Sequence, residues 1–203
     1  IIIGPMFSGK TELLIKKYNN LYNKFWYDYA EESQMTNWCN ETFEKICNTR
    51  LAINYFMDTR YKNDSIVSHN QNSIPSLNLH SLNELFLEKN ENLLKESQYI
   101  FINEAQFFPD LKDIIVRLLE IYEKNIIICG LDSDYKREKF GQIWDLIPHA
   151  NNVIKLTGKC NYCNNKSLFS YRVTNEIKQE IIGTTNYIPL CRKCYLSKNN
   201  LII

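Results

Sequence analysis

The sequence predicts an α/β fold in which a mostly parallel sheet carries helices on both faces and a small lobe follows at the C-terminal end. Three observations predict this fold. Short apolar runs that suit buried strands recur along the chain, stretches with helical spacing separate some of them, and two pairs of cysteines lie near the end. The 203 residues suffice for one such domain with an appendage.

The expected strands are apolar runs of a few residues, at 1–3, 51–55, 99–102, 126–129 and 153–156. Helical spacing is clearest in two of the connections between them. The first helical stripe consists of Leu14, Tyr18, Leu21, Tyr22 and Phe25. The second consists of Leu111, Ile114, Ile115, Leu118, Leu119 and Tyr122. Strands that alternate with helices indicate parallel pairing, because a parallel strand needs a crossover connection.

The composition is that of an ordinary globular protein, with 44% hydrophobic residues, 23% charged residues and a formal charge of +1. No run approaches the ~20 apolar residues that cross a bilayer, so we expect no membrane segment. We expect one α/β domain over residues 1–156, with an insertion at about 26–50, and a lobe over 157–203. Since Ile1 already reads as strand, we expect the natural N-terminus and any targeting segment to lie outside this chain.

Residues 4–11 read GPMFSGKT and match the pattern G-x-x-x-x-G-K-[ST] between an expected strand and an expected helix. This context predicts a P-loop NTPase-like fold and a site for ATP. Loop amides and the helix N-terminus attract phosphates, Lys10 reaches the β and γ phosphates, and the Thr11 hydroxyl binds Mg²⁺. The residues assigned to the nucleotide are Gly4, Pro5, Met6, Phe7, Ser8, Gly9, Lys10 and Thr11.

Two polar residues, Asn103 and Glu104, directly follow the expected strand at 99–102. P-loop enzymes place magnesium ligands and catalytic bases at the carboxyl ends of strands. We therefore assign Asn103 to the nucleotide site and Glu104 to the role of a base that accepts a proton from an attacking hydroxyl. The alternative for Glu104 is a solvated loop glutamate.

Four of the seven cysteines form two C-x-x-C pairs, which are Cys160 with Cys163 and Cys191 with Cys194. Two such pairs predict a closed tetrahedral Zn²⁺ site with a structural role. Two disulfides or four free thiols are the alternatives. The remaining cysteines, Cys39, Cys47 and Cys129, read as small buried apolar residues.

The chain resembles the zinc-containing, or type II, thymidine kinases over most of its length. The resemblance rests on GPMFSGKT at 4–11, DTRY at 58–61, NEAQFF at 103–108, GLDSDY at 130–135 with Phe140 and Gly141, and the cysteine pairs. It implies a P-loop kinase domain over residues 1–156 and a zinc lobe whose lasso loop covers the nucleoside. It also implies transfer of the ATP γ-phosphate to the thymidine 5′-hydroxyl to give dTMP, in nucleotide salvage, with deoxyuridine as a further candidate substrate.

The same resemblance implies roles for single residues and for partners. Glu104, Lys10 and Arg60 would be catalytic. The thymine pocket would consist of Met6, Phe107, Leu131, Tyr135, Phe140, Ile181, Ile182, Gly183 and Tyr187. The implied ligands are ATP, thymidine, Mg²⁺ and Zn²⁺, with dTTP as a candidate feedback inhibitor. A homotetramer in the cytoplasm is expected, and nucleic acid is not an expected partner.

The chain departs from the family pattern at four places. Asn103 stands where the family has aspartate, residues 26–50 have no recognised counterpart, the lasso near 184–186 is shortened, and Glu138-Lys139 replaces a usual pair that contains proline. The first departure leaves open a degenerate homologue that binds nucleotide without turnover. The lobe from residue 157 onward has five more basic than acidic side chains, which leaves open a nucleic-acid-binding protein.

Overall fold

The computed structural model describes residues 1–32, 49–57, 64–176, 178–179 and 186–199. Its centre is a sheet of six parallel strands in the order β5-β2-β6-β7-β1-β8. In chain order these strands are β1 (Ile2–Gly4), β2 (Arg50–Tyr55), β5 (Leu77–Leu79), β6 (Tyr99–Ile102), β7 (Asn125–Leu131) and β8 (Ile154–Lys155). The five predicted strands are all present, and β5 adds an edge strand that the sequence analysis did not predict.

Both faces of the sheet are buried, which explains why its strands read as continuous apolar runs. In β6, the side chains of Ile100 and Ile102 join one hydrophobic cluster, whereas Phe101 between them joins the cluster on the opposite face. Ile53 of β2 lies beside Ile102, and Ile102 lies beside Ile128 of β7, so one apolar row crosses the sheet. Successive side chains of a strand point to opposite faces, and only a covered sheet needs both sets to be apolar.

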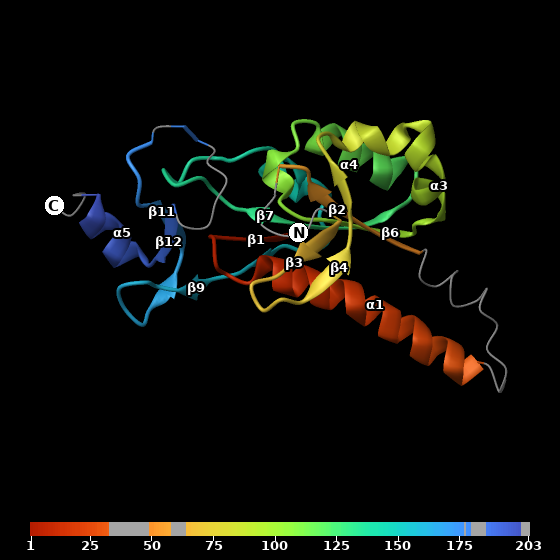
Figure 1. Cartoon of the computed structure of the whole chain (residues 1–203), viewed down its shortest axis with the longest axis horizontal. Helices are drawn as coiled ribbons and strands as arrows, with labels where there is room; N and C mark the ends of the chain where they lie inside the picture. Colours follow the sequence, from red (N-terminus) through yellow and green to blue (C-terminus); the bar gives the residue numbers. More distant parts are fainter. Residues whose placement is uncertain (33–48, 58–63, 177, 180–185, 200–203) are drawn as a thin grey trace.

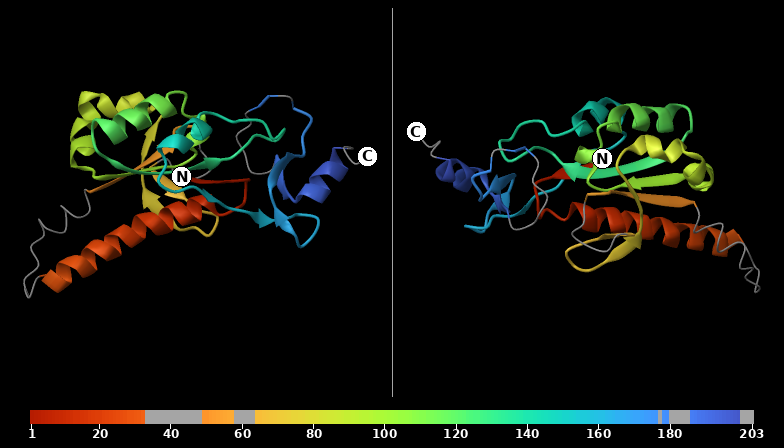
Figure 2. Two further views of the ribbon diagram at one scale, coloured as in Figure 1. Left: turned by 180° about the vertical axis from the view of Figure 1, so that it is seen from behind. Right: turned by 45° about the horizontal axis from the view of Figure 1, so that its top comes forward.

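Helices cover the sheet on both sides, as the fold prediction requires (Figures 1 and 2). The long helix α1 (Lys10–Glu32) crosses one face together with a hairpin of β3 (Ser65–Val67) and β4 (Ser73–Pro75). The other face carries α3 (Glu88–Glu96) and α4 (Leu111–Glu120), with the 3-10 segments η1 (Leu82–Phe86) and η3 (Ile143–His149). Among the described residues, no helix combines the length and apolar character needed to cross a membrane.

The helix α4 bears out most of the predicted stripe. Leu111, Ile114, Ile115 and Leu118 are buried against the sheet, and burying each such side chain contributes about 1.5–3 kcal/mol. Tyr122 is an exception, because α4 ends at Glu120 and the tyrosine is 36% exposed.

The expected insertion at 26–50 begins and ends in regular structure. Residues 26–32 continue α1, and Arg50 is the first residue of β2. Its guanidinium donates to the Tyr18 carbonyl at 2.8 Å and lies over the Tyr18 ring. Residues 33–48 lie outside the described part of the chain.

A small lobe follows the sheet. It contains the antiparallel pairs β9 (Gly158–Lys159) with β10 (Lys166–Ser167) and β11 (Phe169–Arg172) with β12 (Tyr187–Leu190), and then the helix α5 (Arg192–Lys198). Figure 1 shows this lobe at one end of the molecule, beyond the end of β1. Its own hydrophobic cluster contains Leu190 and Tyr195 together with two of the cysteines.

Candidate active site

The predicted site residues follow strands that run in one direction, so the fold brings them to one edge of the sheet. β1 ends at Gly4, β6 at Ile102 and β7 at Leu131, and Leu131 pairs with Gly4 in the register of the sheet. Ligands of open α/β sheets bind at the carboxyl ends of strands. The loop at residues 5–9, the pair Asn103-Glu104 and the segment 132–141 therefore meet at the edge where a substrate would bind.

Residues 5–9 form a tight loop between β1 and α1. Gly9 has φ of +83°, a left-handed conformation that favours glycine, and its carbonyl accepts from Leu13 in the first turn of α1 at 3.0 Å. The buried Lys10 side chain folds back over the loop, where Nζ donates to the Pro5 carbonyl at 2.8 Å. Ser8 Oγ is buried without a hydrogen-bond partner in the described part of the chain. Lys10 Nζ and Ser8 Oγ are donors that could bind an anion at the N-terminus of α1.

The lobe contacts this loop through two of its strands, β9 and β11. The Met6 amide donates to Ser170 Oγ of β11 at 2.9 Å, across 164 positions of sequence. The backbone of Gly158 in β9 also lies against the loop, because a Cβ at that position would come within 2.8 Å of the Phe7 carbonyl oxygen. The lobe therefore supports the conformation of residues 5–9, although the two are far apart in the sequence.

Asn103 lies in a buried polar network directly below the first turn of α1. Its Oδ1 accepts from the Thr11 hydroxyl at 3.3 Å and from the Cys129 thiol at 3.0 Å, while its Nδ2 donates to Asn54 Oδ1 at 2.9 Å. Asn103 is only 3% exposed. The amide therefore directs its acceptor end toward Thr11 and its donor end toward β2.

Asn54 and Cys129 are members of this network that the sequence analysis did not assign to the site. Asn54 is 5% exposed and directly follows the buried apolar residues Leu51, Ala52 and Ile53 of β2. A polar side chain within such a run needs a buried partner, and this was the signal that could have found it.

Glu104 has a backbone conformation that is unusual for a glutamate. Its φ and ψ are 51° and 41°, in the left-handed region, just before the 3-10 segment η2 (Ala105–Phe107). Such a residue costs about 1–3 kcal/mol, and conformations of this kind gather at functional sites. Gln106, which is 3% exposed, donates from Nε2 to Glu104 Oε2 at 2.7 Å and accepts from the Leu131 amide at 3.0 Å. Gln106 thus ties the Glu104 carboxylate to the end of β7.

Gly141 allows the segment 132–141 to pack against the turn that carries Glu104. Its φ is +62°, and a Cβ there would lie 2.2 Å from the Gln106 carbonyl oxygen. Any other residue would push the segment 132–141 away from this turn.

The predicted thymine-pocket residues appear in two groups. In the first, Phe107 stacks on Tyr55 with ring centroids 5.2 Å apart and meets the edge of Phe140 at 5.5 Å. In the second, Tyr135 and Tyr187 both contact Arg172, whose guanidinium carbon is 3.7 Å and 5.1 Å from the two ring centroids. Neither Tyr55 nor Arg172 was among the predicted site residues.

The remaining predicted residues are placed as follows. Met6 lies in the loop at residues 5–9, where its amide contacts the lobe, and Leu131 is the last residue of β7 and bonds Gln106. Arg60 and residues 181–183 lie outside the described part of the chain.

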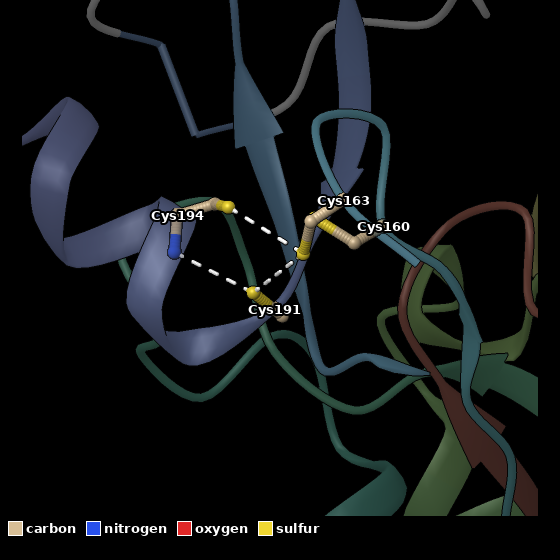
Figure 3. A group of neighbouring side chains, drawn as sticks. All are labelled: Cys160, Cys163, Cys191 and Cys194. Atoms are coloured by element: carbon tan, nitrogen blue, oxygen red, sulfur yellow. Dashed lines mark hydrogen bonds between the residues drawn. The ribbon is translucent and has the colours of Figure 1, made fainter. Parts of the chain in front are cut away.

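The four cysteines of the C-x-x-C pairs converge in the lobe (Figure 3). Their sulfur atoms all lie within 4.8 Å of one another, although the two pairs come from different segments. Cys163 Sγ lies 3.6 Å from Cys191 Sγ and 3.8 Å from Cys194 Sγ. Cys160 and Cys163 lie in the turn between β9 and β10, and Cys191 and Cys194 lie at the start of α5. The chemistry and the spacing of the four sulfurs fit a tetrahedral metal ion.

The ionisation of these thiols is coupled. Burial raises the pKa of Cys160, but backbone hydrogen bonds from Cys191, Tyr162 and Cys163 outweigh it and bring the pKa down to about 6. The hydrogen bond with the Cys191 thiol, followed by burial, raises the pKa of Cys194 to about 12. The thiolate of Cys160 thus forms easily and that of Cys194 does not, and a divalent cation can favour the thiolate form by replacing the thiol proton.

The comparisons with known proteins all match one family. The family model described as "Thymidine kinase" matches residues 33–195. The chain is 34% identical to "Thymidine kinase" of Oryza sativa subsp. japonica over 197 residues, which are 97% of this chain and 65% of that protein. It is 35% identical to "Thymidine kinase" of Yaba monkey tumor virus, covering 98% of this chain and 95% of the viral one. The bacterial "Thymidine kinase" of Bacteroides thetaiotaomicron is 33% identical, with 97% and 85% covered.

Proposed function

Because the chain belongs to the thymidine kinase family, we propose that it transfers the γ-phosphoryl group of ATP to the 5′-hydroxyl of thymidine, as a phosphotransferase with an alcohol acceptor. The observation that carries the proposal is the contact between the first turn of α1 and the end of β6. There the Thr11 hydroxyl meets Asn103 at 3.3 Å, and the strained Glu104 is the next residue. The loop proposed to bind the nucleotide and the candidate base thus share one edge of the sheet.

In this proposal, residues 4–11 hold the phosphates of ATP. Lys10 Nζ would exchange its neutral Pro5 carbonyl for phosphate oxygens, which are better partners for an ammonium group. Thr11 Oγ1 would be an oxygen ligand of Mg²⁺, which prefers oxygen, and Asn103 Oδ1 beside it could accept a hydrogen bond from a water bound to the metal. When bound, Mg²⁺ supplies positive charge that offsets the negative charge of the transferring phosphate.

Glu104 is the proposed base. Its carboxylate would accept the proton of the thymidine 5′-hydroxyl as the oxygen attacks the γ-phosphorus, and the leaving ADP oxygen takes the electron pair of the broken bond. Gln106 holds one carboxylate oxygen by a 2.7 Å hydrogen bond and so limits the orientations of the acceptor. Arg60 is assigned to the transferring phosphate by the family resemblance alone.

The thymine base would lie among the aromatic groups at the same edge. Phe107 and Phe140 offer an apolar surface of half-buried and buried rings, and Tyr135 and Tyr187 come from the segment 132–141 and from the lobe. Flat rings suit a nucleobase because they bury a large apolar area with little loss of conformational freedom.

The substrate assignment is tested by phosphotransfer assays with ATP-Mg²⁺ and each of the four deoxynucleosides. We expect thymidine to have the highest kcat/KM, since a site between close-packed rings suits a pyrimidine better than a larger purine. A preference for purine deoxynucleosides would contradict the assigned pocket. The absence of any nucleoside turnover, with retained ATP binding, would favour the degenerate-homologue alternative.

We also propose that the four cysteines of the lobe hold one structural Zn²⁺. Metal analysis of the reduced protein should then find one zinc per chain. Chelation should increase hydrogen exchange in β11, β12 and α5 more than in β1, β6 and β7, because only the lobe depends on the metal. Restoring zinc should reverse this change. Folded, reduced protein without zinc would exclude the site.

Two further properties are proposals that the family resemblance supports. The first is assembly into a homotetramer. The second is inhibition by dTTP, which carries both a thymine base for the proposed pocket and phosphates of the kind that residues 4–11 are proposed to hold.

A further inference from the structure

We propose that Arg172 is a positioning residue that couples the cysteine lobe to the nucleoside site. In this role, its guanidinium sets the spacing between the Tyr135 and Tyr187 rings and holds the backbone carbonyls of Glu176, Lys178 and Gln179. The inference rests on the proposed function, because these two tyrosines are assigned to the thymine pocket.

Arg172 is the last residue of β11 and is only 5% exposed. Nη1 donates to the carbonyl oxygens of Glu176, at 3.0 Å, and of Lys178. Nη2 donates to the Gln179 carbonyl at 2.9 Å and to the Tyr187 hydroxyl at 2.5 Å. One side chain therefore fixes three backbone carbonyls and one phenol.

The guanidinium also contacts the two tyrosine rings. Its central carbon lies 3.7 Å from the centroid of the Tyr135 ring and 5.1 Å from that of Tyr187. Arg172 thus contacts the two tyrosines in different ways, since it lies over both rings and also bonds the Tyr187 hydroxyl. A planar cation that stacks and donates in its own plane is suited to this position.

A second chain of contacts links the same residues to the α/β domain. Gln179, whose carbonyl Arg172 holds, donates from Nε2 to Asp134 Oδ2 at 2.9 Å. Asp134 is 4% exposed, and its other oxygen accepts from the Lys136 and Glu138 amides. Asp134 therefore orders the turn that follows Tyr135. It also accepts a hydrogen bond from the side chain of Gln179, the residue whose backbone carbonyl Arg172 holds.

The acceptors of Arg172 are neutral in the described part of the chain, and its Nε has no hydrogen-bond partner there. A buried cation costs free energy unless its donors are used, so this arginine is not explained by charge pairing. What it provides is geometry, because four acceptors and two rings converge on a single planar group. A lysine can reach some of these acceptors but cannot reproduce the fork or the stacking.

The test is Arg172→Lys, which keeps the charge and removes the planar fork. We expect KM for thymidine to rise ~10- to 100-fold, the effect of losing hydrogen bonds from a charged donor, while KM for ATP and the zinc content stay unchanged. Arg117→Lys is the matched control. Arg117 also lies over two aromatic rings, those of Phe86 and Tyr122, and donates to the Tyr122 hydroxyl at 3.4 Å. It belongs to α4 and not to the segments at the proposed substrate edge, so its substitution should leave KM for thymidine unchanged.

A double-mutant cycle with Tyr187→Phe separates positioning from general stability. If Arg172 acts through the Tyr187 hydroxyl, the Arg172→Lys effect on KM should be smaller in the Tyr187→Phe background. Additive effects, or an unchanged KM in Arg172→Lys, would overturn the inference while wild-type thymidine phosphorylation still stands. A wild type that does not phosphorylate thymidine would remove the proposed function and this inference with it.

If Arg172→Lys does not fold, Tyr187→Phe carries the test alone, because it removes the hydroxyl acceptor and keeps the ring. A raised KM for thymidine with normal zinc content would then support the positioning role. A wild-type KM in that variant would contradict it.

Discussion

Glu104→Gln is expected to lower kcat for thymidine phosphorylation by about 10²- to 10⁴-fold, the usual contribution of a positioned base. The amide has the size of the carboxylate, and its oxygen can still accept the Gln106 hydrogen bond, so the local structure should persist. It cannot accept the hydroxyl proton. Binding of ATP should be unchanged, and calorimetric titration together with steady-state kinetics would measure the two effects separately.

Glu138→Gln is the matched control for this prediction. Glu138 is an exposed glutamate of the segment 132–141, and its backbone rather than its side chain bonds Asp134. The same chemical change there should leave kcat near the wild-type value. A Glu104→Gln enzyme with near-normal turnover would remove Glu104 from the role of base.

Asn103→Asp has the second largest expected effect, in the opposite direction. If Mg²⁺ lies beside Thr11, the neutral amide of Asn103 can bond a metal-bound water but adds no negative charge. A carboxylate at this position should lower the Mg²⁺ concentration needed for half-maximal activity and raise turnover, with ~10- to 100-fold as the scale for contacts around a metal. Titration of activity with Mg²⁺ at saturating ATP and thymidine would measure it. The nucleoside preference should not change.

The Asn103→Asp substitution should also lower the stability of the fold, because Asn103 lies in a buried hydrogen-bond network. Asn103 Nδ2 donates to Asn54 Oδ1, so an aspartate oxygen in its place would face another acceptor until the Asn54 amide turns over. A carboxylate at a position 3% exposed also loses hydration. We therefore expect Asn103→Asp to unfold at a lower temperature than wild type without Mg²⁺, and ATP-Mg²⁺ to recover part of the loss.

Asn54→Asp is the control for charge alone, because it introduces the same carboxylate on the side of Asn103 away from Thr11. It should not lower the Mg²⁺ requirement as Asn103→Asp does. If Asn103→Asp changes neither Mg²⁺ dependence nor turnover of an active enzyme, another carboxylate serves the metal. Asp132 is the candidate, although Lys155 holds its Oδ2 at 2.8 Å. An inactive wild type that Asn103→Asp activates would establish the degenerate-homologue alternative.

The sheet was predictable because its physical cause is local. Strands that are covered on both faces must be apolar at consecutive positions, so β1, β2, β6 and β7 stand out in the sequence. The short strands β3, β4 and β5 do not, since each has three residues and buries only one of them, which leaves no apolar run in the sequence. The helix α3 was also missed, because its sequence EKNENLLKE is mostly polar.

The candidate site divides in the same way. The sequence by itself determined the glycine-rich loop, the two polar residues after β6 and the two cysteine pairs, because each is a short pattern whose chemistry depends on neighbouring positions. Only the tertiary structure decided which distant groups meet them. Asn54 meets Asn103 across 49 positions, Met6 meets Ser170 across 164, and Arg172 lies over Tyr135. Such contacts depend on strand order and side-chain direction, which arise when the whole chain packs and which no local pattern encodes.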